Sequence, residues 1–362
     1  MRSETTIGLE ALGWDAGHEQ AFAPYRSDGC RPGRVVAEHR GGYTVSDGAE
    51  DHAASLAGRL RHGALTPQAL PTVGDWVAVA DGVIQAILPR RTLLARREPG
   101  SAARDQVLAA NVDVAIIVTS LNRDFNLRRL ERYLGLARGA GVRSLIVLSK
   151  ADLSSDTQAA ARAVEAIAAG APIVVASIPL AVGLDDIREQ LAPGRTAIFL
   201  GSSGVGKSTL INALAGRPLQ AVSAARSDDD RGRHTTTGRQ LLRLPAGWLL
   251  IDTPGLREVG WADDEGLAGT FADIENLANG CRFANCGHEA EPGCAVQSAI
   301  ASGVLAPQRL ASLRTLELEI RAQAGRTLRH RPAATHHYRL PGTTRRPART
   351  RHGEAERDEP ES

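Results

Sequence analysis

The chain has 362 residues, 43% of them hydrophobic, which is enough for two or three domains with buried cores. Its 43 lysines and arginines nearly balance its 41 acidic residues, which excludes a strongly acidic or strongly basic chain. The N-terminal segment lacks the apolar core of a signal peptide, and no apolar run approaches the roughly 18 residues of a membrane span, so we expect a cytoplasmic protein with no membrane partner.

Short strand-like segments separated by turns dominate residues 33–97. They include "GRVVAEH", "YTVS", "DWVAVA" and "VIQAILP", with Gly-Gly and Asp-Gly turns between some of them. About five such strands in a segment of this length predict a small β-barrel. Residues 1–32 are then an N-terminal extension, and residues 98–110 are expected to form a linker.

Residues 111–262 instead alternate apolar runs with amphipathic stretches. The runs "VDVAIIVTS", "SLIVLS" and "TAIFLG" suit strands of a parallel sheet covered on both faces, and "LRRLERYLGLARGAG" has helical periodicity. This pattern predicts an α/β domain of the doubly wound kind.

The C-terminal part has two segments. Residues 263–325 show helical periodicity around a cluster of cysteines. Residues 326–362 are rich in Pro, Thr and Arg, and residues 321–353 contain nine arginines and no acidic residue. We expect a basic, disordered tail after residue 325.

The stretch "GSSGVGKS" follows the apolar run "TAIFL" and precedes a helical pattern, as a phosphate-binding P-loop does. Its glycines allow a tight backbone whose N–H groups point at phosphates, Lys207 supplies a compact charge, and Ser208 is expected to bind Mg²⁺. The alternative is a glycine-rich turn with an exposed lysine. The residues assigned to the nucleotide here are Gly201, Ser202, Ser203, Gly204, Val205, Gly206, Lys207, Ser208 and Thr209.

Two later segments are expected to meet the γ-phosphate. "DTPG" ends a predicted strand, where Asp252 suits Mg²⁺ and the N–H of Gly255 suits the phosphate. The polar loop 227–238 offers Thr235 or Thr236 as a hydroxyl ligand of Mg²⁺, as switch loops do. An ordinary turn and an ordinary solvated loop are the alternatives.

The chain has only two lysines, Lys207 and Lys150 of "LSKAD". Asp152 can accept both N1–H and the 2-amino group of guanine, a donor pair that adenine lacks, while the stem of Lys150 can lie along the base. We therefore expect the segment Ser149–Lys150–Ala151–Asp152 to read guanine, although a surface lysine after a strand is the alternative. Ser177, which ends the next predicted strand, either contacts the base or is a plain strand-end serine.

The base-reading motif precedes the P-loop, whereas it follows it in ordinary GTPases of this type, and circular permutation explains the order. With "PTVGDWVAV", "RGRHTTTGRQL" and "CRFANCGHEAEPGCAV", this arrangement over residues 33–320 resembles the RsgA family of circularly permuted, ribosome small-subunit-dependent GTPases. The resemblance implies an OB-fold barrel, a permuted GTPase domain, a zinc domain, and GTP hydrolysis coupled to late maturation of the 30S subunit and stimulated by that subunit.

The chain departs from the family's pattern at two positions. Ser149 stands where the family has Asn, so we expect its nucleotide affinity to differ. Leu256 follows "DTPG", so no Gln is available there to position water, and His234 is the best replacement. A loop histidine with only a structural hydrogen bond is the alternative. The catalytic residues are therefore taken as His234, Lys207 and Thr236.

Four residues of the third segment can form a closed tetrahedral zinc site. Cys281, Cys286, His288 and Cys294 supply three thiolates and one imidazole, with no open position for substrate. Buried free cysteines are the alternative. Cys30 has no obvious partner.

Two features of the sequence suggest contacts with RNA. A small barrel is a frequent RNA platform and basic residues can neutralise phosphates, so Arg90, Arg91, Arg96 and Arg97 are candidate rRNA contacts, with a solvated basic face as the alternative. We expect a monomer that binds GTP, GDP and the 30S subunit. A nucleotide-gated RNA- or protein-binding module with incidental turnover, and an ATP-using P-loop protein, are the rival functions.

Overall fold

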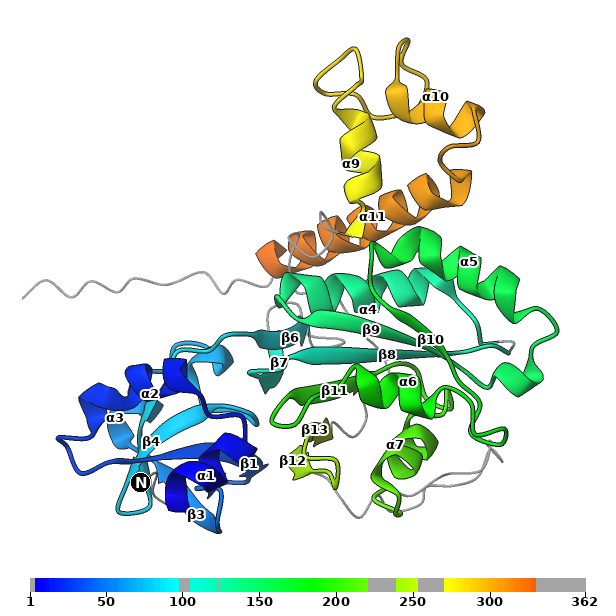
Figure 1. Cartoon of the computed structure of the whole chain (residues 1–362). Coiled ribbons are helices and arrows are strands. Elements are labelled where there is room, and N and C mark those ends of the chain that lie inside the picture. The colour runs from blue at the N-terminus through cyan, green and yellow to red at the C-terminus, as the bar shows by residue number, and fades with distance from the viewer. Residues whose placement is uncertain (1–3, 98–104, 123, 221–238, 253–269, 330–362) are drawn as a thin grey trace, which may run out of the picture.

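The computed structural model describes residues 4–97, 105–122, 124–220, 239–252 and 270–329. It shows a barrel, a layered α/β domain and a helical C-terminal domain (Figure 1). No helix among these residues is long and apolar enough to cross a membrane.

The N-terminal extension is helical and packs on the barrel. It contains α1 (Glu4–Ala11), α2 (Ala16–Phe22) and a short 3₁₀ helix (Ala23–Tyr25), and the Asp15 side chain caps α2. Trp14 lies edge-on to Trp76 of the barrel, with ring centroids 4.8 Å apart. The extension therefore shares a core with the domain that follows it.

Five strands form the barrel. These are β1 (Arg31–His39), β2 (Gly42–Ser46), β3 (Asp51–Leu56), β4 (Trp76–Ala80) and β5 (Val83–Ile87). They pair in the order β1-β2-β3-β5-β4, and β4 pairs back onto β1. Helix α3 (Gly58–Gly63) and a 3₁₀ turn (Pro67–Ala69) connect β3 to β4. A closed five-stranded barrel with this order confirms the expected OB-fold.

The strand β6 (Leu93–Arg97) lies outside the barrel, so the expected end of the barrel and the expected linker both change. It pairs with β7 (Asp105–Ala110) in a separate two-stranded sheet, so residues 93–97 do not belong to the barrel and residues 105–110 are not a linker. The reason is burial, because Leu94 and Leu108 are almost fully removed from solvent. The turn-like residues just before β7 concealed this strand in the sequence.

Six strands form the sheet of the α/β domain. These are β8 (Val114–Ser120), β9 (Arg143–Ser149), β10 (Ile173–Val175), β11 (Thr196–Leu200), β12 (Gln240–Arg243) and β13 (Leu249–Asp252). Their order is β10-β9-β8-β11-β13-β12, and only β12 is antiparallel to its neighbour in this sheet. The strand before the P-loop, β11, therefore lies in the interior of the sheet, between β8 and β13.

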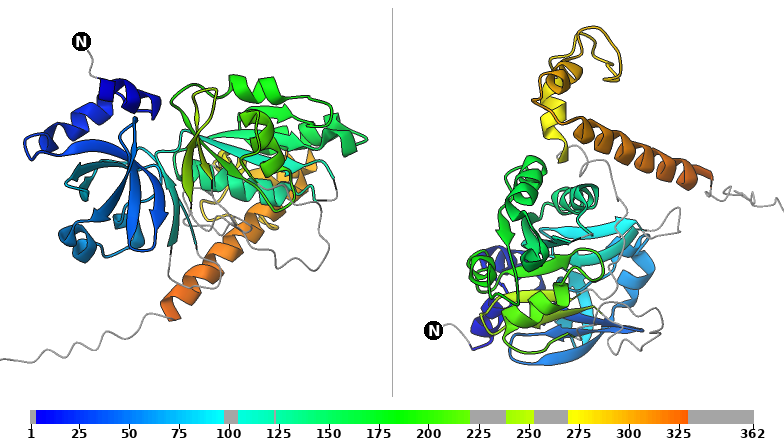
Figure 2. Two further views of the ribbon diagram at one scale, coloured as in Figure 1. Left: turned by 90° about the horizontal axis from the view of Figure 1, so that it is seen from below. Right: turned by 90° about the vertical axis from the view of Figure 1, so that its right-hand side faces the viewer.

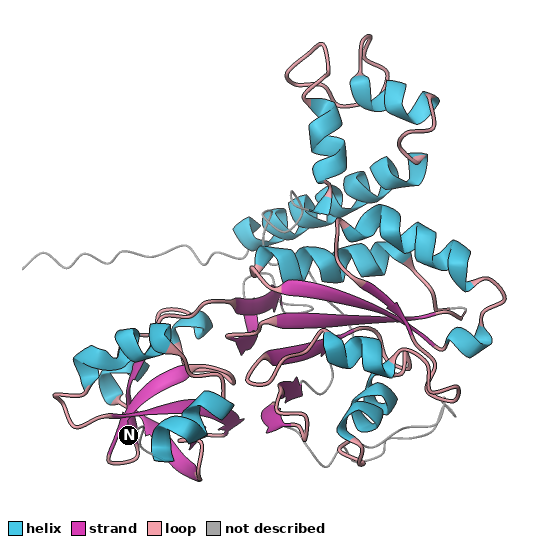
Figure 3. Ribbon diagram, viewed as in Figure 1, coloured by secondary structure: helices cyan, strands magenta, loops and turns pink. Residues whose placement is uncertain are grey.

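Helices cover both faces of this sheet (Figure 3). On one face lie α4 (Leu127–Gly139) and α5 (Thr157–Ala168), and on the other α6 (Leu184–Glu189) and α7 (Lys207–Ala215). Alternate residues of the strands enter the two cores, so that Ile117 packs with the first pair of helices and Ile116 with the second. Burial on both faces explains the fully apolar strands and confirms the doubly wound arrangement.

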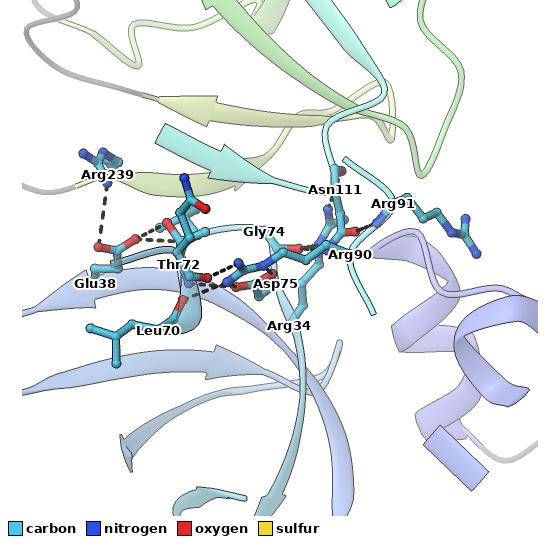
Figure 4. Close-up of polar contacts among 12 residues, drawn as sticks. Arg34, Glu38, Leu70, Thr72, Gly74, Asp75, Arg90, Arg91, Asn111 and Arg239 are labelled. Atoms are coloured by element: carbon cyan, nitrogen blue, oxygen red, sulfur yellow. Dashed lines mark hydrogen bonds and ion pairs between the residues drawn. The ribbon is translucent and has the colours of Figure 1, made fainter. Parts of the chain in front are cut away.

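A buried arginine joins the barrel to the α/β domain (Figure 4). Arg34 of β1 donates to the carbonyl oxygens of Leu12, Gly74 (3.2 Å) and Asn111 (3.2 Å), and to Thr196 Oγ1 (2.9 Å). Burial lowers its pKa to about 10, so the guanidinium stays charged at neutral pH. One side chain thus links the extension, the barrel, the end of β7 and the start of β11.

Two further contacts join β1 to β12. Ala37 pairs with Gln240, which makes the barrel and the α/β sheet continuous. Glu38 accepts hydrogen bonds from Thr72 Oγ1 (2.6 Å) and the Val73 N–H (3.0 Å) and faces Arg239 at 3.9 Å. The barrel is therefore attached at the residue that follows the undescribed segment 221–238.

The C-terminal domain consists of α9 (Ala272–Ala278), α10 (Ala295–Ala301) and α11 (Pro307–Arg329). Its hydrophobic core includes Phe271, Ile274, Val296 and Leu310. Both views in Figure 2 show α11 projecting from this domain as a long helix, and Figure 1 shows it running across α4. Because α11 continues to Arg329, the helix extends past residue 325, where we placed the start of the tail.

Candidate functional site

The P-loop joins the central strand β11 to helix α7. Gly201, Gly204 and Gly206 have φ angles of 148°, 81° and 98°, a region that side chains with a Cβ rarely adopt. A Cβ at Gly201 would lie 2.4 Å from the carbonyl oxygen of Val118. The loop can follow this path only because glycine occupies these positions.

Lys207 is held inside this loop. Its Nζ donates to the carbonyl oxygens of Gly201 (2.8 Å) and Ser202 (2.7 Å). Burial lowers the pKa of Lys207 to about 8. An ammonium group that is partly desolvated and whose partners among the described residues are neutral carbonyls is a good partner for phosphate oxygens.

The other P-loop residues differ in exposure. Ser203 and Gly204 are exposed, Val205 is buried, and Ser208 and Thr209 at the start of α7 are half-buried. The exposed residues are those at the tip of the turn, where a ligand can reach the backbone N–H groups. These groups and the first turn of α7 together form an anion-binding end of a helix.

Ser149 ties the base-reading segment to the P-loop. It is buried at the end of β9, and its hydroxyl donates to the carbonyl oxygen of Val205 at 2.5 Å and lies 3.3 Å from that of Thr119. Lys150, with φ of 55°, reaches across to the carbonyl oxygen of Gly204 at 2.7 Å. The shorter serine therefore keeps a link between the two loops at this position.

Ser177 meets Asp152 in the structure. The buried hydroxyl of Ser177 donates to Asp152 Oδ1 at 2.6 Å, and Ala151 N–H donates to the carbonyl oxygen of Ala176 at 3.2 Å. Asp152 itself is exposed. The Ser177 hydroxyl thus orients a carboxylate that remains open to a ligand. This contact supports a role for Ser177 in the site that acts through Asp152.

Asp252 ends β13 beside the P-loop strand. Burial raises the pKa of this carboxyl group, and a hydrogen bond with the Gln220 side chain partly opposes the rise. A half-buried carboxylate in this position would be stabilised by a cation, as expected of a group that helps to bind Mg²⁺. His234, Thr235, Thr236 and Gly255, predicted to complete the site, lie outside the described residues.

Sequence reasoning missed Arg129 near the P-loop. This residue lies in the first turn of α4, and its Nη1 donates to Ser202 Oγ at 2.8 Å. Knowledge of the strand order could have pointed to Arg129. Helix α4 follows β8, and β8 lies next to β11, the strand that leads into the P-loop.

The predicted zinc ligands come together. The ligand atoms of Cys281, Cys286, His288 and Cys294 all lie within 4.8 Å of one another. His288 Nδ1 is 3.6 Å from Cys281 Sγ and 3.5 Å from Cys294 Sγ, and these two sulfurs are 3.9 Å apart. Tetrahedral zinc with Zn–S bonds of about 2.3 Å separates its ligand atoms by roughly 3.5–3.8 Å. The donor set and its spacing therefore fit a structural zinc ion.

Arg90, one candidate RNA contact, is engaged inside the protein (Figure 4). Its guanidinium binds both carboxylate oxygens of the buried Asp75, at 2.8 and 2.7 Å, and the carbonyl oxygens of Gln68 and Leu70. With these four contacts Arg90 braces the barrel, so its guanidinium is occupied within the protein and we do not propose it as an RNA contact.

The other candidate arginines have different positions. Arg91 forms a bidentate pair with Asp15, at 2.6 and 2.5 Å, and this pair holds the pKa of Asp15 well below its usual range. Arg96 donates to Gln106 Oε1 at 3.0 Å. The side chain of Arg97 lies outside the described residues. Arg91 remains about half exposed and keeps its place among the candidates.

Comparisons with known proteins agree with this architecture. A family model described as RsgA GTPase matches residues 87–262. A "Small ribosomal subunit biogenesis GTPase RsgA" of Opitutus terrae is 45% identical over 327 residues, covering 86% of this chain and 89% of that protein. One of the same name from Streptomyces coelicolor is 45% identical over 319 residues and covers 86% of each chain.

Two solved structures share the fold. YjeQ from Thermotoga maritima gives a TM-score of 0.61 at 29% identity and covers 80% of this chain and 98% of its own. YloQ, described as a circularly permuted GTPase, gives 0.56 at 26% identity and covers 81% and 96%. The permuted order of motifs, the strand order and the extent of the similarity together show that this chain belongs to the RsgA GTPase family and is a circularly permuted GTPase.

Proposed function

We propose that this GTPase acts in the biogenesis of the small ribosomal subunit, where it binds the 30S particle and couples GTP hydrolysis to a late step of its maturation. The relatives that span nearly the whole chain carry the name of small ribosomal subunit biogenesis GTPases. The single observation that carries the proposal beyond the name is the continuity of the barrel with the nucleotide-binding sheet at Ala37 and Gln240. A barrel bound to RNA would thereby act directly on the strand next to the switch segment.

Separate groups of residues in the nucleotide site are assigned to the phosphates, the guanine base and Mg²⁺. Lys207 and the P-loop N–H groups bind the β- and γ-phosphates, and Asp152, oriented by Ser177, reads guanine. Ser208 and Asp252, with Thr236 or Thr235, would hold Mg²⁺, which neutralises charge on the phosphates when bound. Gly255 is assigned to the γ-phosphate.

Hydrolysis needs a residue that orients the attacking water. His234 is our candidate, because Leu256 follows "DTPG" where Ras-like GTPases have a Gln that orients the water. Replacing His234 with Ala should lower GTP turnover much more than GDP affinity. An equal loss of both, or no loss, would remove His234 from this role.

The zinc-binding residues are proposed to have a structural role. Their four donors leave no open coordination position, and Cys294 lies in the core of the C-terminal domain. The metal is therefore expected to hold α9 and α10 together, rather than to take part in hydrolysis. We propose that the C-terminal domain and the arginine-rich residues after it add contacts to rRNA.

Co-sedimentation with purified 30S particles tests binding. The chain should sediment with 30S particles in the presence of a non-hydrolysable GTP analogue, and less of it should do so in GDP. Sedimentation that is independent of the nucleotide would contradict coupling. Nucleotide-dependent binding without stimulated turnover would instead favour the alternative function, a nucleotide-gated binding module with incidental hydrolysis.

A further inference from the structure

The first turn of α4 carries two adjacent arginines, Arg128 and Arg129, and no acidic residue. Positive side chains at this end oppose the helix dipole, so the placement is locally unfavourable. Arg128 is exposed, whereas Arg129 is half-buried and points to the P-loop. The neighbouring pair thus combines one solvated arginine with one that has a specific partner in the nucleotide site.

The contact of Arg129 is well defined at both ends. Asn126 caps the helix by accepting from the backbone N–H of Arg129 at 3.0 Å, which fixes the turn from which the side chain extends. Arg129 Nη1 then donates to Ser202 Oγ at 2.8 Å. The carbonyl oxygen of the same Ser202 accepts from Lys207 Nζ at 2.7 Å. Arg129 therefore holds the residue that in turn positions the phosphate-binding lysine.

The other side of α4 is attached to the C-terminal domain. Glu131 is almost fully buried, and its Oε1 accepts from Arg309 Nη1 of α11 at 2.6 Å. Residues two apart on a helix point in nearly opposite directions, about 200° around its axis. The P-loop contact and the contact with α11, which Figure 1 shows crossing α4, therefore use opposite sides of one turn.

Arg309 is itself firmly fixed. It donates to both carboxylate oxygens of Asp273 at 2.9 and 3.0 Å and to the carbonyl oxygen of Thr270 at 2.6 Å. Its guanidinium also lies 4.3 Å from the ring centroid of Phe271. The position of the zinc-binding domain is thus transmitted to Glu131 through a buried and fully engaged side chain.

We propose that Arg129 is a positioning residue of the P-loop, acting through Ser202, and that Arg309 sets the position of α4 from which Arg129 makes this contact. The zinc-binding domain is then linked to nucleotide affinity through one helix. The inference rests on the nucleotide site alone and does not depend on the ribosome, so its failure would leave the proposed function in ribosome biogenesis untouched.

The first test compares Arg129→Ala, Arg129→Lys and Arg128→Ala in the full-length, zinc-loaded protein. Affinity for a fluorescent GDP and the kcat and KM of basal GTP turnover are measured. Loss of one hydrogen bond to the loop should weaken GDP binding about three- to tenfold in Arg129→Ala. Arg129→Lys keeps the charge and a donor and should recover most of the affinity, while Arg128→Ala removes the same charge and should leave it unchanged. Equal effects of Arg129→Ala and Arg128→Ala would overturn the proposal.

The second test asks whether Arg129 acts through Ser202. In a Ser202→Ala background, Arg129→Ala should cause no further loss of GDP affinity, because the contact is already gone. A further loss as large as in the wild-type background would mean that Arg129 attracts the phosphates directly, and would overturn the positioning role.

The third test addresses the link to the C-terminal domain. Arg309→Met combined with Glu131→Gln removes the buried pair without leaving a buried charge at residue 131, and Asp273, which also loses Arg309, is 40% exposed and can be solvated. Zinc content and thermal melting establish that this variant is folded. It should bind GDP more weakly than the wild type, and its effect should disappear when Arg129→Ala is also present. Unchanged GDP affinity in the folded variant, or effects that multiply with Arg129→Ala, would overturn the link.

Discussion

At the scale of single residues, the base-reading segment is the part of the site most open to a direct test. Asp152 is exposed and oriented by Ser177, and its carboxylate matches the two adjacent donors of guanine. Replacing Asp152 with Asn should lower GDP affinity about a hundredfold or more and create binding of xanthosine diphosphate. Titration with both nucleotides measures this exchange. Asp185→Asn, on an exposed residue of α6, is the control and should bind GDP as the wild type does.

Ser149 carries a second prediction at this scale. Its hydroxyl links the base-reading segment to Val205 of the P-loop. Ser149→Ala removes the link and should weaken GDP binding about three- to tenfold. Ser155→Ala changes an exposed serine nearby and should have no effect in the same binding assay. If the two variants bind GDP equally well, the contact seen in the structure does not support the site.

Lys207 predicts a pH dependence of nucleotide affinity. Its pKa is about 8 because burial disfavours the charged form, and bound phosphates raise the pKa again. Affinity should therefore be constant below pH 7 and fall as the pH rises through 8, by up to about tenfold per pH unit. Lys207→Met should bind weakly at every pH and lack this dependence. Parallel pH profiles of the two proteins would contradict the assignment.

At the scale of elements, the sequence was most informative where one motif demands one local geometry. The glycines of the P-loop and the four zinc ligands needed only the chain around them to be recognised. The strand β7 was missed because polar and turn-forming residues precede it, and its burial depends on partners far along the chain. Arg129 was missed and Arg90 was misjudged for the same reason. The tertiary fold brings Ser202 to Arg129 and Asp75 to Arg90.

The zinc-binding element yields a prediction about stability. Apparent binding of structural zinc contributes about 10–16 kcal/mol to folding of small zinc domains, so α9 and α10 should unfold when the metal is removed. Cys294→Ala should lose the bound zinc and the protection of amide hydrogens in residues 272–301. Cys30→Ser, which changes a buried cysteine far from the cluster, should retain one zinc ion. Retained protection in Cys294→Ala would contradict a structural role of the metal.

At the scale of the whole molecule, the arrangement of domains depends on a few buried polar contacts. Permutation moves the base-reading segment ahead of the P-loop, while the parallel strands β9 and β11 bring both segments to the carboxyl end of the sheet. The barrel is then attached to the start of β11 by Arg34. The permuted order could be predicted from the motifs, but this attachment could not, because an arginine in a strand carries no sign of partners in four separate segments.

Arg34 provides the prediction for this scale. Arg34→Met takes the Arg34 donor from the carbonyl groups of Leu12 and Asn111 in a buried position and should reduce the free energy of unfolding by about 3 kcal/mol or more. Chemical denaturation measures the change. Arg31→Met, on the exposed start of the same strand, should alter stability by less than about 0.5 kcal/mol. Similar stabilities of the two variants would contradict the role given to Arg34.

The central claim is that GTP hydrolysis by this chain is coupled to the small ribosomal subunit. Its most direct test is the rate of GTP turnover with and without purified 30S particles, at saturating GTP and Mg²⁺. Coupling predicts stimulation of at least about tenfold, which corresponds to about 1.4 kcal/mol of the activation barrier. It also predicts that Lys207→Met abolishes the stimulated rate. An unchanged rate in the presence of 30S particles that bind the protein would contradict the claim.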